Sequence, residues 1–122
     1  MLPRYTRDWR LYAEDIIEAC GKVRRYVAGM TYETFASDER TRDAVMRNIE
    51  IIGEAAKNIP DDVASSAPEI EWRNVRGMRD VLAHAYFGAS LEIVWATATS
   101  RMDTLEAAVR KMLDDSGSAS RP

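Results

Sequence analysis

A short segment around the only histidine of the chain carries the side chains best suited to proton and phosphate chemistry. Arg79 and Asp80 precede His84, and Tyr86 follows it. Histidine has an ordinary pKa near neutrality, which suits it to proton transfer. Arginine keeps its charge and offers a planar fork of donors that matches a phosphate. Because no cysteine cluster or paired carboxylate lies beside them, these residues indicate chemistry on a phosphodiester rather than at a metal ion.

The spacing of Arg79 and His84 sets a geometric condition on such a site. Five positions along an unbroken helix turn the chain by about 500°, which leaves the two side chains about 140° apart around the axis. They would not converge on one substrate from a straight helix. We therefore expect either that the helix ends or distorts near Ala83, which Phe87 and Gly88 favour, or that a second copy of the chain completes the site.

The pattern Arg79-x4-His84-x-Tyr86 resembles the signature of the HepT-like HEPN family, the toxin half of a bacterial toxin–antitoxin pair. Residues 10–16, 43–57, 86–88 and 91–95 also look like that family, in the same order. The resemblance covers nearly the whole chain apart from its last few residues. It implies a helical fold and a homodimer that places both motifs along a shared cleft at a twofold interface.

The resemblance also implies a reaction, a metal-independent cleavage of RNA without a cofactor. His84 would take the proton from a ribose 2′-hydroxyl or give one to the leaving 5′-oxygen. Arg79 would stabilise the extra negative charge on the pentacovalent phosphorus, with Asp80 in support by orienting His84 or Arg79. The expected products are a 2′,3′-cyclic phosphate, or the 3′-phosphate formed from it, and a 5′-hydroxyl. Transfer RNA or messenger RNA is the expected substrate class.

Tyr86 has two functional interpretations. Its ring could stack on an unpaired RNA base, with Arg76 as a further RNA contact. In proteins that this chain resembles, a small nucleotidyltransferase antitoxin of the MntA type adds AMP to the motif tyrosine. Such a group beside the cleft would block substrate and place negative charge next to Arg79. A twofold axis would double the local positive charge of Arg76 and Arg79.

Each of these side chains also has a structural interpretation. His84 could cap a helix C-terminus, where its charge would meet the helix dipole favourably. Tyr86 could be a half-buried aromatic residue at a helix end. Arg79 could form a surface salt bridge, Arg76 could be a solvated charge on a helix face, and Asp80 could be an exposed acid.

Two glutamates four residues apart, Glu50 and Glu54, share one face of a predicted helix. Without ligating histidines they do not indicate a metal site, and we expect them to form salt bridges to arginines of the third helix or of a partner subunit. At the level of function, the alternative is a non-catalytic helical partner or substrate-binding module of a nucleotidyltransferase. A family member that has lost toxicity is a third possibility.

Composition indicates one globular domain. The chain has 122 residues, of which 46% are hydrophobic and 30% charged. A net charge of -3 and a pI near 5.2 argue against binding of nucleic acid by bulk electrostatics. Cys20 is the only cysteine, which excludes an intrachain disulfide and fits a reducing cytoplasm. We expect a cytoplasmic protein because no signal peptide or membrane-spanning run is present.

Helical periodicity predicts an all-α, up-and-down four-helix bundle that dimerises through a helical face. The first long helix starts at about Thr6 and stops at Gly29. The second starts after Ser37 or Asp38 and stops at Pro60. One or two short extra helices are expected, one at residues 31–35 with Phe35 over the core and one turn within 61–68. Gly53 inside the second helix predicts a close approach of two helix backbones.

The third predicted helix starts near residues 69–71 and leads without a break into His84. The fourth starts at its cap, Ser90, and presents an apolar face as far as Met112. The sequence thus predicts a helical domain over residues 1–113 and a polar, frayed tail over residues 114–122. Cys20 lies on the apolar face of the first helix and is expected to be a small core residue.

Overall fold

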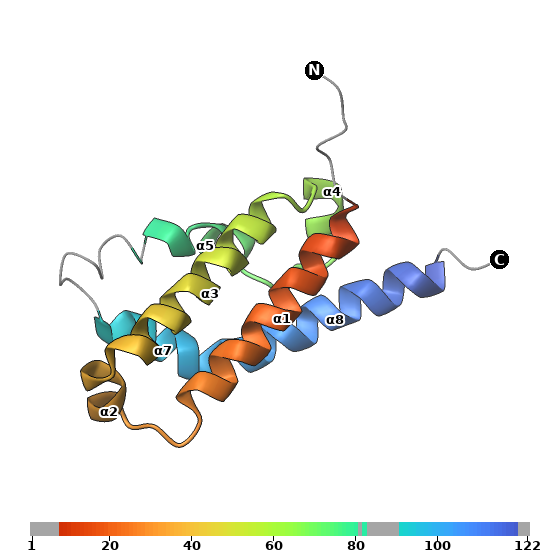
Figure 1. Cartoon of the computed structure of the whole chain (residues 1–122). Helices are drawn as coiled ribbons and strands as arrows, with labels where there is room; N and C mark the ends of the chain where they lie inside the picture. Colours follow the sequence, from red (N-terminus) through yellow and green to blue (C-terminus); the bar gives the residue numbers. More distant parts are fainter. Residues whose placement is uncertain (1–7, 81, 83–90, 120–122) are drawn as a thin grey trace.

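The computed structural model describes residues 8–80, residue 82 and residues 91–119, the last three as backbone only (Figure 1). His84 and Tyr86 lie outside the described residues, as do Ala83 and Ser90. Within these ranges every regular element is an α-helix, so the predicted all-α fold is confirmed. No helix among the described residues is long and apolar enough to cross a membrane.

Three long helices form the body of the molecule (Figure 1). They are α1 (Trp9–Val27), α3 (Glu39–Lys57) and α8 (Met102–Ala119). Helix α1 lies between α3 and α8 and contacts both along its length. The shorter helices are α2 (Tyr32–Ser37), α4 (Asp61–Ala64), α5 (Trp72–Arg76) and α7 (Leu91–Ser100). Helices α2 and α4 are the two short extras that the sequence predicts.

Local capping explains where the helices begin. The Asp38 side chain accepts a hydrogen bond from the Thr41 N–H at 3.0 Å, so Asp38 is the N-cap of α3. Thr31 and Thr34 form a reciprocal capping box at the start of α2. After α1, Gly29 has φ 76°, in the left-handed region that glycine adopts at least cost. The predicted stop of the first helix at Gly29 is therefore confirmed.

The core follows the predicted apolar faces. The buried residues of α1 include Ile16, Cys20 and Val23, and those of α3 include Ile49 and Ile52. Burial desolvates the thiolate and raises the pKa of Cys20 from 9.0 to about 12, as expected for a core residue rather than a reactive thiol.

Phe35 of α2 is fully buried, with its ring centroid 5.1 Å from that of Trp95. The predicted closure of Phe35 over the core is therefore confirmed.

A buried carboxylate joins α1 to α8. Glu106 accepts hydrogen bonds from Arg24 of α1 and from Arg110 of its own helix, the latter at 2.9 Å from Nη2 to Oε2. The Glu106 side chain is only 11% exposed, and two arginine partners compensate the loss of water around its charge. This pairing ties the first and last helices together.

The third helix differs from the prediction because it is interrupted. Helix α5 begins at Trp72 and ends at Arg76, residue 77 is a turn, and residues 78–80 are helical again. Gly77 lowers helix propensity at this point. A Cβ atom on Gly77 would lie 3.2 Å from the Arg73 carbonyl oxygen, so the local backbone is tighter than a side chain prefers. Arg79 and Asp80 thus follow a break rather than sit in a continuous helix.

The fourth predicted helix is also divided, into α7 and α8, with a turn at Arg101. Three hydroxyl side chains before the turn, those of Thr97, Thr99 and Ser100, donate to carbonyls four residues earlier. Hydrogen bonds of this kind bend helices. The predicted apolar face is nevertheless buried at Val94, Met102 and Val109.

The predicted polar tail is largely helical. Helix α8 continues to Ala119, past residue 113, where the sequence predicts that order ends. A tertiary contact explains part of this extension, because the Arg10 Nη2 of α1 donates to the Ser116 hydroxyl at 2.7 Å. The division into a domain over residues 1–113 and a tail over residues 114–122 stays a prediction.

Candidate functional site

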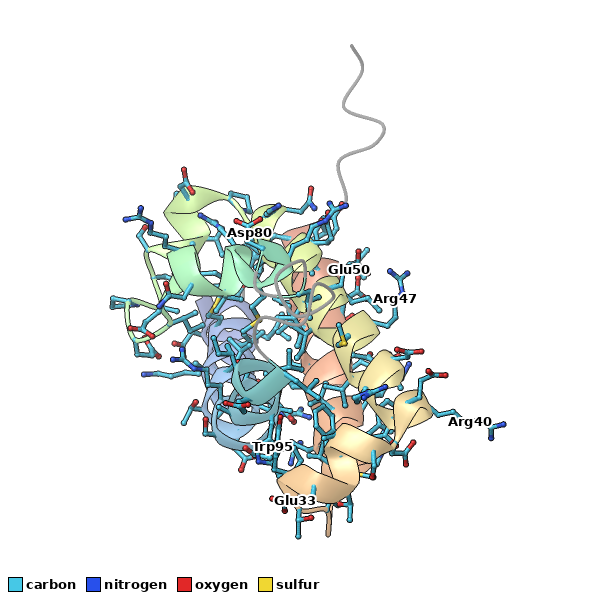
Figure 2. All side chains as sticks on the ribbon, turned by 90° about the vertical axis from the view of Figure 1, so that its left-hand side faces the viewer. Glu33, Arg40, Arg47, Glu50, Asp80 and Trp95 are labelled. Carbon is cyan, nitrogen blue, oxygen red and sulfur yellow. The ribbon has the colours of Figure 1, made fainter. Side chains whose placement is uncertain are left out.

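Arg79 and Asp80 are the two members of the predicted motif whose positions the structure describes. Both are exposed and lie on the turn of helix that follows Gly77. Figure 2 shows this face of the molecule, where Asp80 lies across from Arg47 and Glu50 of α3. The predicted roles of His84 and Tyr86, and the convergence of His84 with Arg79, fall outside the described residues and stay predictions.

The guanidinium of Arg79 forms an ion pair with Glu54 of α3. Its Nη1 lies 2.9 Å from Glu54 Oε1, and the two side chains are 60% and 47% exposed. The predicted salt bridge between Glu54 and an arginine of the third helix is therefore confirmed. Glu50 differs, because it pairs with Arg47 on its own helix at 3.0 Å. Sequence reasoning gave Glu54 no functional part, although Glu54 directly follows the unusual helical Gly53.

The carboxylate of Asp80 makes no hydrogen bond or ion pair with any residue in the described ranges. The Asp80 backbone N–H donates to the Gly77 carbonyl at 3.0 Å, which begins the helical turn after the break. Glu54, rather than Asp80, thus contacts the Arg79 guanidinium. The alternative role for Asp80, orientation of His84, stays a prediction.

A close approach of two backbones holds Glu54 and Arg79 opposite each other. A Cβ atom on Gly53 would lie 3.4 Å from the Val75 carbonyl oxygen and 3.7 Å from the Met78 Cβ. Glu54 directly follows Gly53, and Arg79 directly follows Met78. The predicted packing reason for Gly53 is confirmed, and its consequence is that the ion pair stands beside a direct contact between α3 and the third-helix segment.

Arg76 lies three positions before Arg79 and has a different environment. Its Nε donates to the Ala56 carbonyl at 3.0 Å, and its Nη2 donates to the Ile59 carbonyl at 2.8 Å. Its Nη1 pairs with Asp61 at 3.2 Å. The Ala56 carbonyl lies in the last turn of α3, where it also accepts the Ile59 N–H at 3.3 Å, and the Ile59 carbonyl lies just past the helix end at Lys57. Arg76 therefore caps α3 and is not a solvated helix-face charge; an RNA contact by Arg76 stays a prediction.

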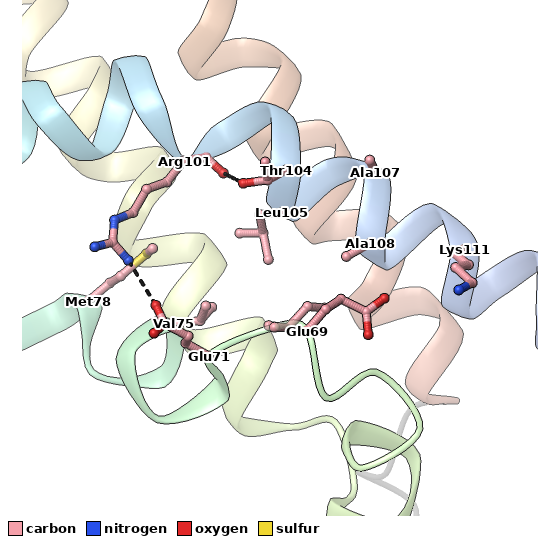
Figure 3. A pocket seen from close by; sticks show the side chains of 11 residues that line it. Glu69, Glu71, Val75, Met78, Arg101, Thr104, Leu105, Ala107, Ala108 and Lys111 are labelled. Carbon is pink, nitrogen blue, oxygen red and sulfur yellow. Dashed lines mark hydrogen bonds and ion pairs between the residues drawn. The ribbon is translucent and has the colours of Figure 1, made fainter.

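A groove of about 580 Å³ lies away from this ion pair, between α8 and the segment that leads into α5 (Figure 3). Val75, Met78 and Leu105 contribute apolar side chains to its lining. Glu71 and Arg101 face each other across it at 3.4 Å (Figure 3). Among the described residues, no group of three histidine, cysteine or carboxylate side chains is placed to hold a metal ion.

Comparisons with known proteins concern almost the whole chain. A family model described as ribonuclease HepT-like matches residues 16–112. A "Probable ribonuclease HepT" of Thermococcus cleftensis is 41% identical over 106 residues, which are 87% of this chain and 96% of that protein. A "Putative RNase" of Caldanaerobacter subterraneus is 36% identical over 104 residues, 85% of this chain and 93% of that protein.

A third relative, a "Putative RNase" of Methanocaldococcus jannaschii, is 38% identical over 89 residues, 73% of this chain and 74% of that protein. No solved structure matches the chain significantly. The three relatives and the family model agree, and the model covers far more than half of the 122 residues. The chain belongs to the HepT-like ribonuclease family.

Proposed function

We propose that this protein is a metal-independent endoribonuclease and the toxin component of a HEPN–nucleotidyltransferase toxin–antitoxin module. The observation that carries the proposal is that Arg79, in the motif Arg79-x4-His84-x-Tyr86 of a HepT-like ribonuclease, is exposed on the protein surface. A guanidinium open to solvent can meet an RNA phosphate without any rearrangement of the core.

In the proposed reaction, His84 accepts the proton of a ribose 2′-hydroxyl. The 2′-oxygen then forms a bond to the adjacent phosphorus, and the bond from phosphorus to the 5′-oxygen breaks. The leaving 5′-oxygen takes up a proton, and the products are a 2′,3′-cyclic phosphate and a 5′-hydroxyl. Arg79 donates to the phosphoryl oxygens while their negative charge is greatest.

The proposal includes a homodimer, in which each chain faces the same cleft. The net charge of -3 gives a single chain little attraction for RNA. A twofold axis beside residues 76–79 would bring two copies of Arg79 together and so concentrate positive charge locally. Transfer RNA or messenger RNA is the proposed substrate class, and the antitoxin of the MntA type is the proposed partner.

Modification of Tyr86 is the proposed means of control. The antitoxin would transfer AMP from ATP to the Tyr86 phenolic oxygen and release pyrophosphate. The added phosphodiester carries a negative charge, which would compete with RNA for Arg79 and obstruct the cleft. Incubation with the antitoxin and ATP is expected to add the mass of AMP to wild type and to Arg79→Ala, but not to Tyr86→Phe.

Cleavage of RNA by purified protein tests the central part of the proposal. Wild type, Arg79→Ala, His84→Ala and Arg73→Ala are incubated with total RNA and EDTA, after intact mass has shown that Tyr86 is unmodified. Arg73 is an exposed arginine on α5 and serves as the matched control for loss of one positive charge. We expect wild type and Arg73→Ala to leave cyclic phosphate ends, and the other two variants to lose cleavage.

Two outcomes contradict the proposal. If unmodified wild type cuts no RNA, the enzyme interpretation fails. The remaining interpretation is a non-catalytic module that binds a nucleotidyltransferase, and His84→Ala would then weaken that binding. Cleavage that survives in both Arg79→Ala and His84→Ala would place the chemistry elsewhere in the chain.

A further inference from the structure

We propose that Glu54 is a positioning residue for RNA cleavage, which holds the Arg79 guanidinium so that its remaining donors face the scissile phosphate. The inference rests on the proposed ribonuclease function and adds a residue outside the Arg79–His84–Tyr86 motif. It starts from one contact, the 2.9 Å bond between Arg79 Nη1 and Glu54 Oε1.

The geometry of this contact leaves most of the arginine fork available. Only Nη1 is bonded to Glu54, and among the described residues neither Nη2 nor Nε of Arg79 has a hydrogen-bond acceptor. A guanidinium has five N–H donors in fixed directions. One carboxylate at one nitrogen therefore fixes the direction of the group while the other edge can donate to a phosphate.

Fold stability does not explain why the pair is there. Both side chains are about half exposed, at 60% and 47%, and ion pairs in such surroundings contribute little to the free energy of folding. Arg79 also has a long side chain with many rotamers, so an unpaired Arg79 would lose much entropy when it meets a substrate. A partner that restricts Arg79 in advance reduces that loss.

The two backbones that carry the pair lie close together, which a positioning contact requires. Gly53 brings α3 against Val75 and Met78, so that a Cβ atom placed on Gly53 would lie 3.4 Å from the Val75 carbonyl oxygen. Met78 is itself buried at 6% exposure. Glu54 and Arg79 are the next residues on the two sides of this contact, so their Cα atoms cannot drift apart without opening the core.

The opposite effect has its own prediction, because a carboxylate also competes with a phosphate for arginine. Competition predicts that removing Glu54 strengthens RNA binding and cleavage, whereas positioning predicts that it weakens them. The single bond at Nη1 favours positioning, since a competitor would be expected to occupy two nitrogens side by side, as a phosphate does. The sign of the effect therefore separates the two possibilities.

The test uses single-turnover cleavage of a short single-stranded RNA by the full-length protein. The variants are Glu54→Ala, Glu54→Gln, Arg79→Ala, the double variant of Glu54→Ala with Arg79→Ala, and Glu50→Gln. Glu50 is the matched control, a carboxylate one turn earlier on α3 that pairs with Arg47 at 3.0 Å and not with the third helix. Thermal melting of each variant shows whether folding is unchanged.

We expect Glu54→Ala to lower the rate at saturating RNA by about 10-fold, with less change in the RNA concentration for half-saturation. Glu54→Gln should lose less, because its amide oxygen still accepts from Arg79. Glu50→Gln should stay within about twofold of wild type. The double variant should be no slower than Arg79→Ala, because Glu54 acts through Arg79. The inference is overturned if the rate losses of Glu54→Ala and Arg79→Ala multiply in the double variant. It is also overturned if Glu54→Ala cleaves RNA faster than wild type.

A binding measurement separates this inference from the ribonuclease proposal. The same RNA with 2′-O-methyl groups cannot be cleaved, and its dissociation constant is measured for wild type, the two single variants and the double variant. Non-additive losses of binding free energy in the double variant support positioning, whether or not wild type cuts RNA. If wild type cuts no RNA, only the ribonuclease proposal fails. Additive losses, tighter binding by Glu54→Ala, or no loss in Arg79→Ala overturn the positioning role.

Discussion

Two arginines three residues apart, Arg76 and Arg79, have opposite surroundings. The Arg76 side chain is 26% exposed, and its three nitrogens reach the Ala56 carbonyl in the last turn of α3, the Ile59 carbonyl just past it and the Asp61 carboxylate. The Arg79 side chain is 60% exposed and bonds one carboxylate through one nitrogen. The difference teaches that the fold uses a donor on each of the three nitrogens of Arg76, whereas it uses one nitrogen of Arg79 and leaves that guanidinium largely exposed to solvent.

The break at Gly77 lies between them and helps to produce this difference. Before the break, α5 directs Arg76 onto the end of α3; after it, the chain starts a new turn that presents Arg79 to solvent next to Glu54. A continuous helix would turn by about 300° between the two positions. Two arginines three residues apart thus have different surroundings, one bonded to the fold and one exposed beside Glu54.

The largest expected effect is on catalysis, at Arg79. Arg79→Ala should lower the rate of RNA cleavage about 100- to 1000-fold, the usual cost of one donor to a developing oxyanion. The free energy of unfolding should change by less than about 0.5 kcal/mol, because the lost ion pair is exposed. Cleavage assays and denaturant melts measure the two effects. A variant that loses stability and keeps its activity would reverse the comparison.

The next effect concerns the packing of α3 against the third-helix segment, which carries both arginines. Gly53→Val should destabilise the protein by about 1–3 kcal/mol, because its branched side chain would press on the Val75 carbonyl and on Met78. Urea denaturation measures the change. Gly21→Ala is the matched control in α1, where the nearest atom to a Cβ is the flexible Arg25 Nη1 at 3.4 Å.

That control should stabilise the helix by about 0.5–1 kcal/mol. Equal effects of the two glycine substitutions would show that Gly53 has no special contact.

Arg76 should affect stability and not chemistry. Arg76→Ala is expected to cost about 1–2 kcal/mol, since it removes the side-chain donor from the carbonyls of Ala56 and Ile59. Arg73→Ala, on the same short helix, should stay within about 0.5 kcal/mol. Melting curves test stability, and cleavage per folded molecule tests chemistry. A loss of RNA binding in a fully folded Arg76→Ala variant would instead support the RNA contact that the sequence predicts.

The smallest effect concerns the buried core around Cys20, the same hydrophobic core to which Met78 belongs. Burial raises the pKa of Cys20 to about 12 from 9.0, so the folded protein keeps the thiol protonated where the unfolded chain ionises it. This contribution to stability is complete below pH 9.0 and is lost as the pH rises toward about 12. At pH 8, a thiol reagent should label native protein at least about 10-fold more slowly than denatured protein. Equal rates would mean that α1 opens readily.

The sequence predicts the helical bundle well because its information is local and repeated. Apolar residues at three- and four-residue steps define the buried faces of α1, α3 and α8, and Asp38 and Gly29 mark helix ends through their own backbone and side-chain chemistry. The resemblance to the family also depends on residue types and spacing, at residues 79–86 together with residues 10–16, 43–57 and 91–95, and the comparisons confirm the family. The salt bridge of Glu54 to the third helix is predicted by the same face-sharing argument.

Other features are not encoded in helical periodicity. The break at Gly77 and the division at Arg101 follow from local chemistry, a glycine and hydroxyl side chains that bond carbonyls four residues earlier. The extension of α8 toward Ser116 involves a contact between distant segments, the bond from Arg10. The choice of Arg76 as a cap and of Glu54 as the partner of Arg79 depends on how α3 packs against the third-helix segment. The sequence by itself determined the long helices, their buried faces and the family. Only tertiary packing decided which arginine supports the fold and which is left exposed. The reason is that the donors of an arginine bond whichever acceptors folding brings within about 3 Å of them.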